Sequence, residues 1–213
     1  MRVWKRPARA LSPTAVSSHA RQLADAFVDA AHHQPSLAMQ MLARNPGLAT
    51  ARATWNETAL EAASHLGHAP LLRKLLDAGA QLDLFAACAL GDTQAVHAML
   101  PSAGLDACGV HGLPLGHFAV MSRDVGMLEL LTDAGVRLNP PRASLSPLHS
   151  AVGIGSVPMI RALVAAGVDC SATDGYGATA LDWAYELGDR GTVLAVLLAA
   201  GLRGAKFDLR TAS

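Results

Sequence analysis

Two short apolar patterns with helical spacing stand close together in residues 146–170. In the first, Leu148, Ala151 and Val152 lie three and four positions apart, so they share one face of a helix. Ser146 precedes them and can cap that helix, because its hydroxyl can accept a hydrogen bond from a backbone N–H of the first turn. The pattern therefore predicts a helix that begins directly after Ser146.

The second pattern follows after a glycine. Ile160, Leu163 and Val164 repeat the spacing, while Gly155 and Gly167 end the first and the second predicted helix. Gly167 stands where a left-handed backbone conformation commonly closes a helix. Neither helix is long enough to be stable alone in water. The pair must therefore bury its apolar face against similar neighbours.

Similar helix pairs are predicted along most of the chain. A longer helix is expected from Thr14, with Phe27 and Val28 in its apolar stripe, and a second helix near residues 36–44. Further copies cover residues 57–83, 84–106, 111–139 and 173–201. Their core alanines follow one another at steps of 24, 32, 32 and 33 residues: Ala63, Ala87, Ala119, Ala151 and Ala184.

This repeat resembles the ankyrin repeat, whose pattern is T-P-L-H-x-A with a period near 33. The closest fragments are SPLHSAV from Ser146 and GATALDWA from Gly177, and a mid-repeat glycine, a leucine pair and a closing glycine recur in phase. The resemblance covers about residues 27–201. It implies an all-α, ankyrin-type helical solenoid of about six stacked helix-turn-helix repeats with short or reduced β-turn fingers.

The predicted repeat domain spans residues 14–204, between a basic flexible leader (1–13) and a C-terminal tail (205–213). The 24-residue step leaves no room for a finger before Leu84, so that finger should be missing or reduced. Gly116 is interpreted as one extra residue within the motif of its repeat. The repeats are expected at about residues 14–54, 55–83, 84–109, 110–142, 143–172 and 173–204.

Composition narrows the class of partner. Lysine plus arginine (17) balances aspartate plus glutamate (17), so no overall positive charge recruits nucleic acid. No segment approaches the about 20 apolar residues of a membrane span. The three cysteines form no CxxC pair, which disfavours a disulfide framework or a cysteine zinc site. We therefore expect a cytoplasmic protein without a nucleic-acid or membrane partner; the alternative is secretion, with the leader as a targeting signal.

No catalytic, cofactor or metal site is predicted. His117 and His149 occupy the histidine position of the ankyrin motif, where the resemblance implies a structural hydrogen bond to backbone. His32 and His33 adjoin on a helix, and neighbouring positions do not share a face. Ser150 beside His149 is interpreted as a chance neighbour, and no small-molecule substrate is expected.

The resemblance implies that fingers and exposed sides of the first helices line a concave groove that binds another protein or peptide. The groove predicted in this way is rich in apolar groups, which suggests an apolar or amphipathic peptide segment as its occupant. Its residues are Trp55, Glu57, His65, Leu66, Leu90, His111, Leu113, Met121, Arg142, Leu145, Ile154, Tyr176, Glu186 and Leu187.

The predicted helix from Thr192 to Ala200 is apolar on all sides, although the end of a stack needs a polar outer face. Either the tail covers it with Phe207 and Leu209, or a partner docks there. The function expected overall is a non-catalytic protein–protein interaction module. Its alternative is a secreted effector that engages a host protein, and an enzyme is the less favoured class. Alanine richness and diverged repeats favour a bacterial chain.

Overall fold

The structure, a computed structural model, describes residues 13–140, 144–188 and 191–202. These residues form twelve α-helices and two short 3₁₀ helices, and no β-strand. The helices are α1 (Pro13–His33), α2 (Pro35–Arg44), η1 (Pro46–Thr50), α3 (Ala59–His65), α4 (Ala69–Asp77), α5 (Leu84–Leu90), α6 (Thr93–Ala103), η2 (Val110–Gly112), α7 (Leu115–Ser122), α8 (Val125–Asp133), α9 (Pro147–Gly153), α10 (Val157–Ala165), α11 (Ala180–Glu186) and α12 (Thr192–Ala199).

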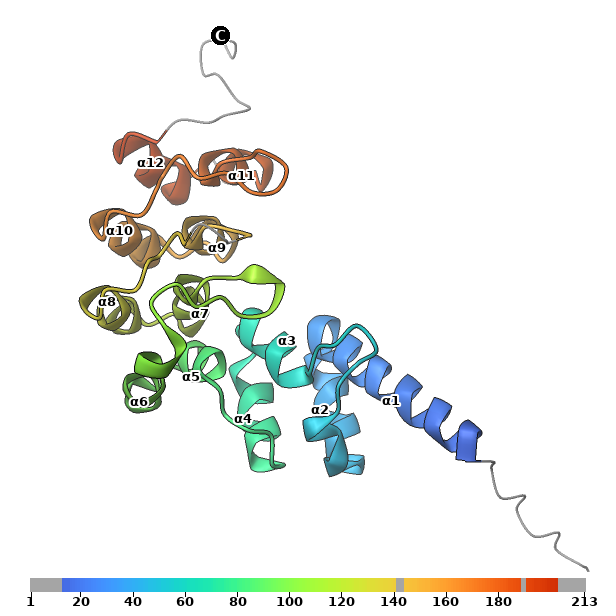
Figure 1. Cartoon of the computed structure of the whole chain (residues 1–213). Helices are drawn as coiled ribbons and strands as arrows, with labels where there is room; N and C mark the ends of the chain where they lie inside the picture. The colour runs from blue at the N-terminus through green and yellow to red at the C-terminus, as the bar shows by residue number, and fades with distance from the viewer. Residues whose placement is uncertain (1–12, 141–143, 189–190, 203–213) are drawn as a thin grey trace, which may run out of the picture.

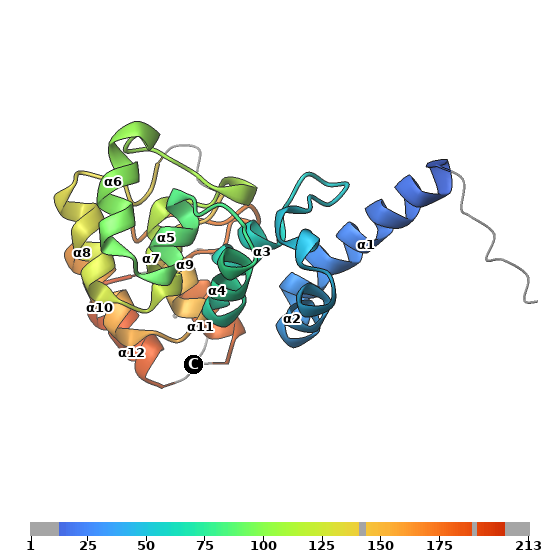
Figure 2. The same ribbon diagram turned by 90° about the horizontal axis from the view of Figure 1, so that it is seen from below.

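The helices stack as consecutive pairs, α1–α2 to α11–α12 (Figure 1). The first helices contact one another in series from α1 through α3, α5, α7 and α9 to α11, and α8, α10 and α12 form a second row beside them. Figure 2 shows α1 and α2 at one end of the stack, with α1 extending away from it. Each pair packs mainly against its neighbours in the stack, so the expected all-α, ankyrin-type solenoid is confirmed.

Within the described part of the chain, three turns project from the row of first helices, each closed by a single antiparallel bridge. We name them the first finger (52–58), the second finger (108–114) and the third finger (173–179). Residues 78–83 join α4 to α5 without such a bridge. The expectation that the finger before Leu84 is missing or reduced is therefore confirmed.

Four of the first helices, α3, α5, α9 and α11, begin at side chains that satisfy free N–H groups of their first turn. Thr58 and Glu61 form a reciprocal capping box before α3, and Thr179 and Asp182 form another before α11. Ser146 accepts a hydrogen bond from the N–H of Leu148, as its position predicts. The capping boxes explain why an acidic residue replaces the motif histidine in two repeats.

Gly116 is not an extra residue, contrary to the sequence interpretation. Pro114 precedes α7 as Ser146 precedes α9, so Gly116 and Leu148 occupy the same position in their helices. A Cβ atom on Gly116 would lie 3.1 Å from Cγ of Pro147. A glycine therefore fills a leucine position here because the next repeat approaches closely.

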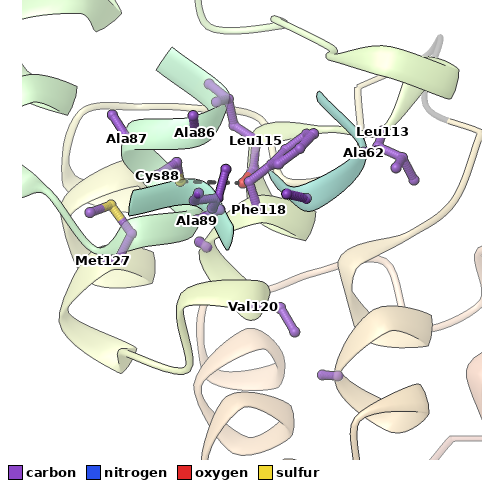
Figure 3. Close-up of a cluster of buried hydrophobic side chains, with 14 of the residues drawn as sticks. Ala62, Ala86, Ala87, Cys88, Ala89, Leu113, Leu115, Phe118, Val120 and Met127 are labelled. Carbon is purple, nitrogen blue, oxygen red and sulfur yellow. Dashed lines mark hydrogen bonds between the residues drawn. The ribbon is translucent and has the colours of Figure 1, made fainter. Parts of the chain in front are cut away.

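The core between α5 and α7 combines small and large side chains (Figure 3). Cys88 is buried next to the core alanine Ala87, and its Sγ lies 3.7 Å from the backbone oxygen of Leu115. Burial raises the pKa of this thiol, so it stays protonated. Phe118 fills the space next to the small residues and packs on Phe85, with ring centroids 5.0 Å apart. Alanine and cysteine thus let the backbones approach while phenylalanine supplies the volume.

The last helix, α12, buries Val193, Val196 and Leu197 and leaves Leu198 exposed. Phe207 and Leu209, the residues expected to cover it, lie outside the described residues, as do residues 1–12 of the leader. The covering of α12 by the tail or by a partner stays a prediction. None of the helices described here has the length and apolar character needed to cross a membrane.

Candidate functional site

The predicted groove residues fall on the fingers and on the ends of the first helices. Trp55, His111 and Tyr176 occupy equivalent positions at the tips of the first, second and third fingers, and all three are exposed. Leu66 and Leu187 are exposed directly after α3 and α11. These residues form the accessible part of the surface.

Other predicted groove residues contribute less surface. Glu186 is exposed. Leu113 is buried, because the second residue after a fingertip turns into the core, so it offers no surface to a partner, contrary to the expectation. Arg142 lies outside the described residues. Partly buried side chains packed against the core account for most of the remainder: Leu90, Met121, Leu145 and Ile154.

The remaining two residues, Glu57 and His65, belong to a cluster with His32 and His111. Oε1 of Glu57 lies 3.2 Å from Nε2 of His32, 3.4 Å from Nε2 of His65 and 3.3 Å from Nε2 of His111. Nε2 of His32 and Nε2 of His65 lie 3.3 Å apart. The Glu57 side chain is 3% exposed, whereas that of His111 is 52% exposed. The cluster is thus buried at its carboxylate and open at one histidine.

Hydrogen bonds around the cluster orient two of its members. Nδ1 of His32 lies 2.9 Å from the backbone oxygen of Val28, and the indole N–H of Trp55 donates to Oε2 of Glu57 at 3.0 Å. The other carboxylate oxygen, Oε1 of Glu57, is buried and accepts no hydrogen bond. A buried carboxylate oxygen without a donor is costly unless a cation stands beside it.

His65 is held in its neutral form. Burial, and after it the positive charges that His32, His111, His117 and His68 can carry, lower the pKa of His65 to about 3. At neutral pH its imidazole therefore carries one proton and one lone pair. That is the form in which histidine binds metal ions.

The two motif histidines have structural roles, as the resemblance implied. Nε2 of His149 donates to the backbone oxygen of Ala178 in the third finger at 2.9 Å. Nε2 of His117 donates to the backbone oxygen of His65 at 2.8 Å, and its Nδ1 lies 2.7 Å from the hydroxyl of Ser150. Burial lowers the pKa of His117 to about 4. His117 thus lies between the Ser150 hydroxyl and a backbone carbonyl. In a catalytic triad, a carboxylate would stand in the place of that carbonyl.

His149 gives the folded protein a defined pH dependence. Burial lowers its pKa below 6.5, against the opposing effects of its bond to Ala178 and of the Asp174 and Asp182 charges. The unfolded chain therefore binds the proton more readily, so stability is present above pH 6.5 and is lost as the pH falls. We expect the free energy of unfolding of His149→Gln to fall less steeply on acidification than that of wild type. The two slopes should differ by at most about 1.4 kcal/mol per pH unit, because a single proton is involved.

Urea unfolding at about pH 7.5 and about pH 5 measures this difference, and His97→Gln, which alters an exposed histidine on α6, is the matched control. An equal fall in stability for wild type and His149→Gln would contradict the role of His149.

The cluster of His32, Glu57, His65 and His111 was missed at the sequence level, where no metal site was predicted. His32 was weighed only against His33, whose side chain is exposed and lies 3.9 Å from Asp29 instead. One signal was available. Glu57 is the second residue after a fingertip, a position that holds an apolar residue in the other two fingers, so a buried charge could have been expected there.

The comparison with known families agrees with this architecture. The family model described as ankyrin repeats (3 copies) matches residues 117–210. No curated protein matches the sequence. Ankyrin repeats generally mediate protein–protein interactions, and proteins of this family are typically non-catalytic. The repeat motif and the stacked helix pairs agree with this match, so residues 117–210, the part of the chain that the family model covers, are ankyrin repeats.

Proposed function

We propose that this protein is a non-catalytic interaction module that binds a segment of a partner protein along its fingertips and first helices. One observation carries the proposal. Of the seven large apolar side chains that are exposed among the described residues, four lie on this surface: Trp55, Leu66, Tyr176 and Leu187.

Exposed apolar groups that gather on one face are typical of binding surfaces rather than of ordinary solvent-facing surface. Trp55 and Tyr176 stand at the tips of the first and third fingers, so two aromatic side chains flank the row of first helices. Aromatic side chains contribute a large contact area and are frequent centres of binding energy. The surface therefore suits an extended partner segment with apolar side chains along one side.

The occupant is a peptide segment that is apolar or amphipathic. The leucines after α3 and α11 would contact its apolar side chains, and Glu186 next to Leu187 supplies a negative charge at one end of the surface. A basic residue in the segment would complement that charge.

A matched pair of double variants tests the proposal. Leu66→Ser with Leu187→Ser changes two groove leucines that are 40% and 60% exposed, while Leu37→Ser with Leu105→Ser changes two leucines outside the groove that are 40% and 48% exposed. Peptides selected on wild-type protein from a phage-displayed random library provide the ligands. We expect the groove pair to weaken their binding at least about tenfold, which is a loss of about 1.4 kcal/mol.

The control pair should bind these peptides like wild type. Equal affinity of the groove pair and wild type, measured by fluorescence anisotropy, would refute binding at this surface. Equal losses in both pairs would show that the effect comes from general apolar exposure and not from the groove.

A further inference from the structure

We propose that His32, Glu57, His65 and His111 form a tetrahedral Zn²⁺ site. Their ligand atoms all lie within 4.8 Å of one another, and they come from α1, the first finger, α3 and the second finger. The inference is independent of the peptide-binding groove, since it rests on the geometry and chemistry of these four side chains alone.

The distances fit a tetrahedron around zinc. Ligand atoms at the about 2.0–2.1 Å typical of zinc–nitrogen and zinc–oxygen bonds lie about 3.3–3.4 Å from one another at the corners of a tetrahedron. A tetrahedron has six such distances. Four of them are given above, at 3.2, 3.3, 3.3 and 3.4 Å, and the other two, between His111 and the two other histidines, are within 4.8 Å. One ion can therefore reach all three histidine nitrogens and the Glu57 oxygen.

The lone pairs of the cluster face one another. Because the Val28 carbonyl can only accept, Nδ1 of His32 carries a proton, so the tautomer that can bind a metal ion presents its lone pair at Nε2. That lone pair faces Nε2 of His65 and Oε1 of Glu57, which is buried without a hydrogen bond. Lone pairs that converge in this way repel one another unless a cation lies between them.

The donor set selects among cations. Three imidazoles and one carboxylate disfavour Mg²⁺ and Ca²⁺, which prefer oxygen ligands. In a square-planar site, neighbouring ligands would lie only about 2.8–2.9 Å apart, closer than the distances observed, which disfavours the tetragonal geometry of Cu²⁺ or Ni²⁺. Zn²⁺ combines the observed ligands with the observed spacing.

The surroundings have the features of a metal centre. The Val28 carbonyl fixes the His32 ring and the Trp55 indole fixes the Glu57 carboxylate, as outer-shell partners do around bound zinc. His111 has a φ of 59°, a left-handed conformation that costs free energy for a residue other than glycine and that contacts in the folded chain must offset. Its side chain is the most exposed of the four, so it marks the route by which the ion enters.

Four protein ligands complete the coordination of zinc, so the site is structural rather than catalytic. The ion ties the N-terminal helix pair to the first two fingers. His111 reaches Glu57 because no finger rises from residues 78–83, between the first and second fingers. The missing finger is thus the feature that brings the second finger to the cluster.

Zinc titration of the full chain, first stripped with a chelator, tests the site. Isothermal calorimetry should give one Zn²⁺ per wild-type chain. His111→Asn keeps a residue that tolerates the left-handed backbone but removes the nitrogen ligand. We expect it to weaken zinc binding more than about 100-fold, since loss of an outer-shell partner alone costs about 10–100-fold. His33→Asn, which changes the exposed histidine next to His32, should bind like wild type.

Co²⁺ substitution measures the geometry. A tetrahedral Co²⁺ site absorbs visible light intensely, whereas a six-coordinate site absorbs weakly, and Glu57→Gln should diminish the intense bands. Equal thermal unfolding of the metal-free variants controls for misfolding. The proposal is overturned if wild type binds no zinc, if His111→Asn binds as tightly as His33→Asn, or if bound Co²⁺ shows only the weak six-coordinate spectrum.

Discussion

Phe118→Ala is expected to lower the free energy of unfolding by about 3–5 kcal/mol, the range for a fully buried phenylalanine. The ring is 1% exposed and packs on Phe85 and on the edge-oriented ring of His117. A Cβ atom on Gly109 would lie only 2.8 Å from Cζ of this ring, which shows how closely the second finger packs on it. Truncation would leave a cavity that neighbouring alanines cannot fill.

Urea unfolding followed by circular dichroism measures the effect. Phe118→Leu retains most of the volume and should cost clearly less, so the pair separates cavity formation from loss of the ring contacts. A loss below about 1 kcal/mol for Phe118→Ala would mean that α5 and α7 can collapse into the space, against the close packing seen in Figure 3.

Leu148→Ala is expected to cost about 2–5 kcal/mol and to divide unfolding into two steps. Leu148 is 1% exposed in α9, and α9 contacts both α7 and α11. In a solenoid, stability is passed from one repeat to the next, so a lesion between neighbours weakens the coupling between the two sides of the array. The mutation should therefore lower overall stability and also separate the ends.

Tryptophan fluorescence can follow the two sides separately. Trp55 lies in the first finger and Trp183 in α11, so variants in which one of these two is the sole tryptophan, with Trp4 also replaced, report on the N-terminal and C-terminal repeats. The two transitions should coincide in the wild-type background and separate with Leu148→Ala. Leu105→Ala, at an exposed leucine, should change stability by less than about 0.5 kcal/mol. Coincident transitions with Leu148→Ala would contradict the expected uncoupling.

Local patterns in the sequence were sufficient to predict the stacked helix pairs. Apolar spacing, Ser146 as a cap and glycines after helices are short-range signals, and each of them corresponds to a helix boundary in the structure. The predicted alignment of the repeat that contains Gly116 was wrong, because its local signal was ambiguous. Pro114 and Leu115 resemble the start of the motif, but Pro114 is the capping residue of α7 and Leu115 its first residue. A glycine is needed at position 116 because Pro147 of the next repeat packs against it. The residues around Gly116 in the sequence give no sign of that contact.

The candidate site was predictable only in part. The fingertip positions of Trp55, His111 and Tyr176 followed from the repeat pattern, because equivalent positions in a solenoid line up on one face. The grouping of His111 with Glu57 did not follow, since it depends on how far two fingers stand apart after one finger is lost. Contacts between non-adjacent repeats depend on the curvature of the stack, which residue spacing does not give.

The direct contact between α3 and α7 bears on how quickly the protein folds. α3 belongs to the second helix pair and α7 to the fourth, yet the two helices touch, and His117 bonds the His65 carbonyl across 52 residues of chain. Contacts between residues distant in sequence require closure of a long loop before any energy is gained, and they slow folding. A strict array of adjacent contacts could begin to fold at any repeat. We therefore expect the second, third and fourth helix pairs to fold together and more slowly than a strict array of adjacent contacts would.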